Sequence, residues 1–212
     1  MTGRMWVNVL RVVFGLLAAA ALGAAAVEAP TAGAFVSDFT VLAAAASCAL
    51  LLYLGVQGLR EPPDGAPSRL LDNVRGAVVL YLAVPGIVFG LLPVTQPSTL
   101  AVPWATTVMD GVLPLVLAAD WLLTPPSRPV SYQDAAGWLV FPLAYTAYAL
   151  IRGAATGDYP YPFLDPAVGN GGYGRVTGAV FLLLVLFVAV GSLVRQLGST
   201  LATRPGPTAE AV

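Results

Sequence analysis

Asp110 is the residue of this sequence whose position most suggests chemistry, because it stands inside an apolar segment. Thr106 and Thr107 lie one helical turn before it and Pro114 lies one turn after it, which gives that segment a polar, locally adaptable face. An ionisable residue within a membrane span usually faces the bundle interior or a water-filled cavity. Asp110 could therefore act as a base, an orienting hydrogen-bond acceptor or a proton carrier. The alternative is a purely architectural aspartate that pairs with Arg152 or with a tyrosine hydroxyl.

The residue types that are missing exclude several other chemistries. The 212 residues include no histidine, which is the commonest general base and a common metal ligand. The single cysteine, Cys48, cannot form an internal disulfide or a thiolate-ligated cluster, and we expect it to pack as a small apolar side chain. A formal net charge of -1 argues against nucleic acid as a partner. We expect neither a metal nor another cofactor.

The elements that carry these residues are predicted to be membrane-spanning helices. Apolar side chains make up 58% of the chain, charged ones only 10%, and the mean hydropathy is +0.80, whereas soluble domains carry roughly 25% charged residues. A spanning helix needs about 20 mostly apolar residues. Six segments qualify and predict an all-α, integral membrane bundle of six transmembrane helices, spanning residues 7–27, 37–58, 74–94, 104–124, 134–153 and 174–197.

Proline and glycine separate these segments and define one predicted domain, residues 1–202. The breaks fall at residues 28–30, 61–65, 93–103, 125–126 and 153–173, and residues 203–212 are expected to form a disordered tail. The first segment has a second interpretation. Arg4, an apolar run and the alanines before Val27 also resemble a cleavable signal peptide.

The arginines predict the orientation of the bundle, since positive charge stays on the cytoplasmic side. Of the ten basic residues, all arginines, only Arg152 and Arg175 fall on one side of a six-span arrangement. The other side receives Arg4, Arg11, Arg60, Arg69, Arg75, Arg128, Arg195 and Arg204. We therefore expect both termini to be cytoplasmic, with the chain in the plasma membrane. Arginine without lysine also suggests a GC-rich bacterial genome.

This topology brings polar residues of several spans to a similar depth in the outer half of the bundle. At about 1.5 Å per residue, Thr40 lies about 4.5 Å and Asp110 about 9 Å below the outer ends of their spans. Tyr145 and Tyr148 lie about 12 and 8 Å below theirs, with Arg152 just above. Asp120 is expected much deeper, near the inner boundary, as an interfacial residue.

Three segments resemble a known family when they are considered together. Phe39-Thr40 opens the second span, Asp110-Gly111-Val112-Leu113-Pro114 leads into Asp120-Trp121 in the fourth, and Tyr161-Pro162-Phe163-Leu164-Asp165 follows the fifth. Their order and spacing are similar to those of the androgen-induced and androgen-dependent membrane proteins, and more closely to their bacterial six-span relatives. The resemblance covers most of the chain.

This resemblance implies a threonine hydrolase that acts on fatty-acid esters of hydroxy fatty acids. The family's nucleophile maps onto Thr40, and the position of its catalytic histidine reads Asp110 here. A threonine hydroxyl needs a neighbouring base to become a nucleophile, and a desolvated carboxylate can take that part. We expect a long-chain ester as substrate, membrane lipids as partners, and substrate contacts from Tyr145, Tyr148, Arg152, Tyr161 and Phe163.

Two other functions compete with hydrolysis. A chain that has lost the family's histidine could be a non-catalytic lipid-binding or scaffolding membrane protein. A small-solute or proton transporter could use Asp110, but the sequence shows no inverted-repeat halves with broken helices. No sequence feature specifies an oligomeric state.

Overall fold

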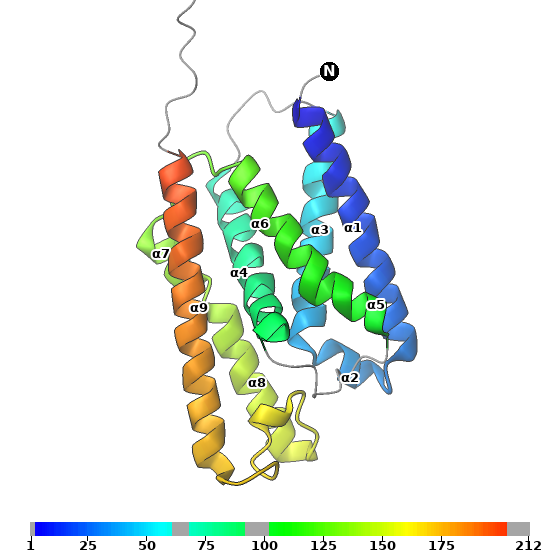
Figure 1. Cartoon of the computed structure of the whole chain (residues 1–212), viewed down its shortest axis with the longest axis vertical. Helices are drawn as coiled ribbons and strands as arrows, with labels where there is room; N and C mark the ends of the chain where they lie inside the picture. The colour runs from blue at the N-terminus through cyan, green and yellow to red at the C-terminus, as the bar shows by residue number, and fades with distance from the viewer. Residues whose placement is uncertain (1–2, 61–67, 92–101, 203–212) are drawn as a thin grey trace, which may run out of the picture.

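The computed structural model describes residues 3–60, 68–91 and 102–202, and the regular elements in these ranges are all helices. In this part of the chain, six helical segments are long and apolar enough to cross a membrane. Successive segments run in opposite directions (Figure 1). The predicted all-α bundle of six transmembrane helices is confirmed, and it has the architecture of a multi-pass membrane protein. The segments are α1 (Gly3–Glu28), α3 (Phe39–Arg60), α4 (Arg69–Leu91), α5–η1–α6 (Pro103–Leu123), α7–α8 (Tyr132–Thr156) and α9 (Gly172–Ala202).

The bundle has two ends that differ in what they carry. α1 begins and α9 ends at the same end, at the top of Figure 1, which we call the termini end. The opposite end carries the short helix α2 (Ala32–Val36) and the connection 157–171 with its 3-10 helix η2 (Pro162–Leu164), and we call it the loop end. α8 stops there at Gly157, whose φ of 73° favours glycine.

Small residues let α1 lie close against α3. A Cβ atom at Gly15 would lie 2.7 Å from the Leu52 side chain, and one at Gly55 would lie 2.7 Å from that of Val12. Such close approach is typical of membrane helices, where van der Waals packing replaces the hydrophobic effect between helices. The same face of α1 buries Ala18, Ala21 and Ala25 completely.

The fourth spanning segment is not a continuous α-helix. It consists of α5 (Pro103–Thr106), the π-helix η1 (Thr107–Val112) and α6 (Leu113–Leu123). The N–H of Leu113 donates to the carbonyl of Val108, five residues back. Pro114 has no N–H to give to the carbonyl of Asp110, as an α-helix would require. The resulting π turn contains Asp110, and such turns are frequent at functional sites.

The fifth segment, expected as one run over 134–153, is broken between α7 (Tyr132–Gly137) and α8 (Val140–Thr156). Ser131 and Asp134 form a reciprocal capping box at the start of α7. Trp138 sits at the break, and its indole N–H donates to Asn73 Oδ1 at 2.5 Å. Gly76 leaves room for this ring, because a Cβ atom there would overlap it. Docking of Trp138 on α4 therefore fixes the break.

Aromatic rings fill the space between α8 and its neighbours at the start of α3. Phe39 contacts each of the other rings in this cluster, with centroid separations of 5.0–6.4 Å. Edge-to-face and tilted ring pairs of this kind stabilise beyond the burial of their area. The partners come from three other helices and are Tyr81, Phe141, Tyr145 and Phe187.

Several helices extend past the predicted spans. α1 starts four residues before residue 7, at Gly3, and α9 runs beyond 174–197 at both ends. The predicted breaks at 61–65 and over most of 93–103, the end of the third span at 94 and the tail 203–212 lie outside the described residues. The single domain over 1–202 stays a prediction.

Candidate functional site

Thr40 and Asp110 meet at the loop end, although they come from different spans. Thr40 lies in the first turn of α3 and is only 8% exposed. Its side chain is close enough to the carboxyl of Asp110 in η1 to interact with it. The Oδ1 atom of Asp110 is buried and has no hydrogen-bond partner within the described ranges. The site therefore places a hydroxyl beside a carboxyl group that retains an unused acceptor.

The π turn η1 carries Asp110, and α4 packs directly against this turn. A Cβ atom at Gly86 would lie 2.9 Å from the Asp110 carbonyl oxygen and 2.9 Å from Pro114 Cγ. Only glycine allows α4 to approach this closely without displacing backbone atoms. The close approach at Gly86 therefore supports the backbone of the π turn at Asp110.

A second carboxylate, Asp38, also flanks Thr40, and sequence reasoning did not select it. Its Oδ1 atom accepts the N–H groups of Thr40 at 2.8 Å and Val41 at 3.2 Å, which caps the start of α3. Asp38 is 7% exposed, and its charge acts on the Asp110 carboxyl. An aspartate just before an apolar helical run is a known N-cap signal, so the sequence contained the information needed to find it.

Two residues that were predicted to contact the substrate, Tyr145 and Tyr148, instead form hydrogen bonds with Ser37, the residue before Asp38. Tyr145 donates from its hydroxyl to the carbonyl of Ser37 at 2.6 Å. The Tyr148 hydroxyl lies 2.8 Å from Ser37 Oγ and shares a hydrogen bond with it. Both tyrosines belong to α8, so they tie this helix to the connection between α2 and α3. Any contact that they make with a substrate stays a prediction.

Tyr161 and Phe163 reach the same place from the connection 157–171. The Tyr161 hydroxyl accepts the N–H of Phe39 at 3.0 Å and donates to Asp38 Oδ1 at 3.3 Å. Phe163 stacks on the Tyr161 ring with 5.2 Å between centroids. Burial raises the pKa of the Tyr161 phenol well above its usual range, and the negative charge of Asp38 adds to this effect. Tyr161 therefore remains a neutral donor and acceptor.

Arg152 does not pair with Asp110, so the alternative prediction of an architectural ion pair between these two residues is wrong. Its guanidinium donates to the backbone carbonyl of Asp158 at 2.6 Å and to the carboxylate of the same residue at 2.7 Å. Six residues separate the two partners, and the left-handed turn at Gly157 brings them together. This pair borders a surface hollow next to the candidate site, lined by Ala34, Ser37, Asp38, Arg152, Asp158, Tyr159 and Pro160.

A separate cluster of charges occupies the termini end. Asp120 lies between two arginines, with 2.6 Å to Arg11 Nε and 3.0 Å to Arg75. Arg75 also pairs with Asp72 at 3.5 Å, and the Asp72 carboxylate accepts the hydroxyl of Ser127 at 2.6 Å. Asp120 is 9% exposed and joins α1, α4 and α6, and its expected position at the membrane interface stays a prediction. Sequence could not show which helices are neighbours.

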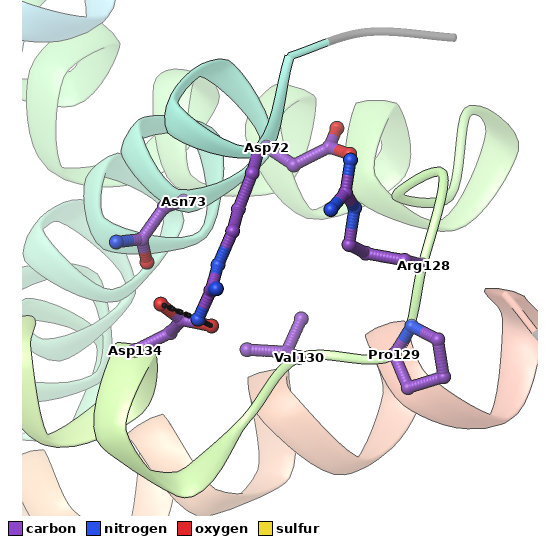
Figure 2. A pocket seen from close by; sticks show the side chains of 7 residues that line it. Asp72, Asn73, Arg128, Pro129, Val130 and Asp134 are labelled. Atoms are coloured by element: carbon purple, nitrogen blue, oxygen red, sulfur yellow. Dashed lines mark hydrogen bonds and ion pairs between the residues drawn. The ribbon is translucent and has the colours of Figure 1, made fainter.

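A small hollow near this cluster opens between the start of α4, the 124–131 connection and α7 (Figure 2). Arg69 is one of its lining residues and donates to both carboxylate oxygens of Asp134 at 3.1 Å. It lies at the opposite end of the bundle from Thr40, so it is not part of the candidate site. Across the described ranges, no three histidine, cysteine or acidic residues gather closely enough to hold a metal ion.

Comparisons of the chain with protein-family models, with curated proteins and with solved structures find no match. The family resemblance therefore rests on the residues alone and stays a prediction. The arrangement itself allows one reaction type. A hydroxyl beside a carboxylate acceptor, in an apolar surrounding, can become a nucleophile for acyl transfer.

Proposed function

We propose that this multi-pass membrane protein hydrolyses ester bonds in lipids, with Thr40 as nucleophile and Asp110 as general base. One observation carries the proposal. The Thr40 side chain interacts with the Asp110 carboxyl, whose buried Oδ1 atom has no partner in the described part of the chain. The resemblance to the androgen-induced and androgen-dependent proteins supports the same roles, because both residues stand where that family has its catalytic pair.

The reaction proceeds in two steps that conserve the proton. Asp110 takes the Thr40 hydroxyl proton as Oγ attacks the ester carbonyl carbon, and the proton then passes to the departing alkoxide. This leaves the acyl group on Thr40 as an ester. Asp110 then takes a proton from water, the resulting hydroxide attacks the acyl carbon, and the returned proton restores the Thr40 hydroxyl. A free fatty acid and an alcohol result.

The surroundings of Asp110 fit this role. None of the salt bridges in the described residues involves it, so no cation occupies the lone pairs that must accept the proton. Asp38, in contrast, is committed to backbone N–H groups of α3. The two carboxylates therefore divide their tasks, with Asp38 shaping the helix end and Asp110 remaining available.

Substitution of Thr40 tests the proposal. We expect the purified wild-type protein to react with a fluorophosphonate probe and to turn over a long-chain ester in detergent. Thr40→Ala should abolish both, whereas Thr40→Ser retains a hydroxyl and should keep measurable labelling. Labelling of the wild-type protein that persists in Thr40→Ala, or no turnover by the wild-type protein, would contradict hydrolysis at this residue.

A non-catalytic lipid-binding protein is the second candidate, favoured by the absence of histidine from the chain. Asp110→His separates the two. If the fold retains an otherwise complete site, this variant gains hydrolysis that the wild-type protein lacks. If the wild-type protein is already a hydrolase with a carboxylate base, both proteins turn over ester, and Asp110→Asn does not.

We also propose that the chain lies in the plasma membrane with its termini end on the cytoplasmic side. Arg4 lies in the first turn of α1 at this end, which also carries Arg69, Arg75 and Arg195, whereas Arg152 and Arg175 lie at the loop end. A reporter that is active only in the cytoplasm should be active when fused at Val212. Activity of an exported reporter at that position would reverse the orientation.

A further inference from the structure

We propose that Tyr161 is a positioning residue for Thr40, acting through the first turn of α3 rather than through contact with substrate. This inference rests on the proposed hydrolysis and assigns Tyr161 a part in it. It departs from the expectation that Tyr161 binds the substrate directly.

The first turn of α3 has its N–H groups satisfied by two side chains. A helix begins with N–H groups that have no partner within the helix. Asp38 accepts those of Thr40 and Val41 at 2.8 and 3.2 Å, and Tyr161 accepts that of Phe39 at 3.0 Å. The tyrosine is thus the member of this set that comes from a distant segment, 122 residues along the chain.

Tyr161 also fixes the capping carboxylate. Its hydroxyl donates to the Asp38 Oδ1 atom that receives the two other N–H groups. One phenol therefore contacts both residues that immediately precede Thr40. Because the phenol is buried and its pKa is raised, it keeps the proton for this hydrogen bond over the ordinary pH range.

The connection that carries Tyr161 is itself anchored, so it can hold α3 in place. Phe163 stacks on the Tyr161 ring. Arg175, from the start of α9, donates to the carbonyl of Pro162 at 3.2 Å and to that of Asp165 at 2.5 Å. The connection 157–171 therefore links the start of α3, where Thr40 lies, to the start of α9. Displacement of a reacting group by about 1 Å can reduce a rate by about 100-fold.

Tyr161→Phe removes only the hydroxyl and is the test. With a long-chain ester as probe, we expect kcat to fall at least about tenfold with little change in KM, because alignment rather than binding is lost. Fluorophosphonate labelling of Thr40 should slow in parallel. Tyr53→Phe is the matched control, since Tyr53 lies on α3, the helix that carries Thr40, and its side chain is 54% exposed. A raised KM with unchanged kcat would instead make Tyr161 a substrate contact and overturn the inference.

Amide hydrogen exchange gives a readout that does not depend on turnover. In Tyr161→Phe, the amide of Phe39 should exchange at least about tenfold faster than in the wild-type protein, with smaller increases at Thr40 and Val41. Unchanged exchange at Phe39 would refute the positioning role even if activity fell. Faster exchange in a protein with no esterase activity would refute the proposed hydrolysis and leave the effect on α3 established.

Discussion

The two ends of the bundle each hold an aspartate of the fourth spanning segment, buried at Asp120 and half-buried at Asp110, and the two aspartates have opposite kinds of partner. At the termini end, Asp120 contacts Arg11 at 2.6 Å and Arg75 at 3.0 Å. At the loop end, Asp110 has a threonine as its neighbour and a buried oxygen without a partner in the described ranges. Burial of a carboxylate is therefore not by itself a sign of function. The identity of its partners separates an architectural aspartate from an available one.

The backbone around the two aspartates also differs between the two ends. Asp120 lies in the regular helix α6, and its two arginine partners make further contacts there, Arg11 with the Thr124 hydroxyl and Arg75 with the Trp121 ring. Asp110 lies in a π turn that departs from regular helix geometry. A departure of this kind persists only when neighbouring packing supports it, here at Gly86. The loop end thus combines an uncommitted carboxylate with an irregular backbone.

The largest expected effect comes from removing the paired aspartate. Asp120→Ala leaves the guanidinium groups of Arg11 and Arg75, whose side chains are 12% and 5% exposed, without their shared counterion, and we expect it to lower the free energy of unfolding by about 3–5 kcal/mol. Thermal unfolding in detergent would show this as a large fall in Tm. Asp158→Asn is the control, because its side chain is 64% exposed in a similar ion pair and should cost less than about 1 kcal/mol. If the two substitutions lowered the Tm equally, the ion pairs of Asp120 would not be more important for stability than an exposed pair at the loop end.

An intermediate effect is expected from Gly86→Ala, which tests how the π turn is supported. The new methyl group would lie 2.9 Å from the Asp110 carbonyl oxygen and from Pro114 Cγ, and we expect a loss of about 1–3 kcal/mol. Gly90→Ala on the same helix meets nothing within 4 Å and should be neutral or slightly stabilising. Thermal unfolding of both variants in detergent measures the difference in their stability. Equal stability would show that the π turn can shift to make room for the new methyl group.

The smallest effect on stability is expected from Asp110→Asn. The exchange is nearly isosteric and breaks no ion pair, so the free energy of unfolding should change by less than about 1 kcal/mol. Fluorophosphonate labelling at Thr40 should nevertheless be lost, because an amide cannot accept the hydroxyl proton. Destabilisation as large as that of Asp120→Ala would show that Asp110 is architectural too.

The sequence predicted the helical class and the number of spans because long apolar runs have few alternative structures. The places of Thr40 and Asp110 in their spans also predicted that the two residues lie at a similar depth, but not that they are neighbours. The partners of Asp120 could not be predicted, since hydropathy gives the order of the spans but not which helices are neighbours. Arg11 and Arg75 are 109 and 45 residues from Asp120.

Other features depend on packing that leaves a weak local signal. Pro114 predicts an irregularity near Asp110, but the choice of a π turn reflects the close approach of α4 at Gly86. The break before α8 follows from Trp138 docking on Asn73, a contact between two spans. Arg152 was assigned to the site from its depth, whereas its actual partner, Asp158, stands six residues along the chain.

The contact between Arg11 and Asp120 also orders the assembly of the protein. At about 5–20 residues per second, the 109 residues between them take about 5–20 seconds to synthesise. During that interval the first helix has no access to this carboxylate, and its guanidinium must extend to the headgroup region. We expect α1 and α4 to reach their final arrangement only when the fourth segment enters the membrane, so this late segment completes the termini end.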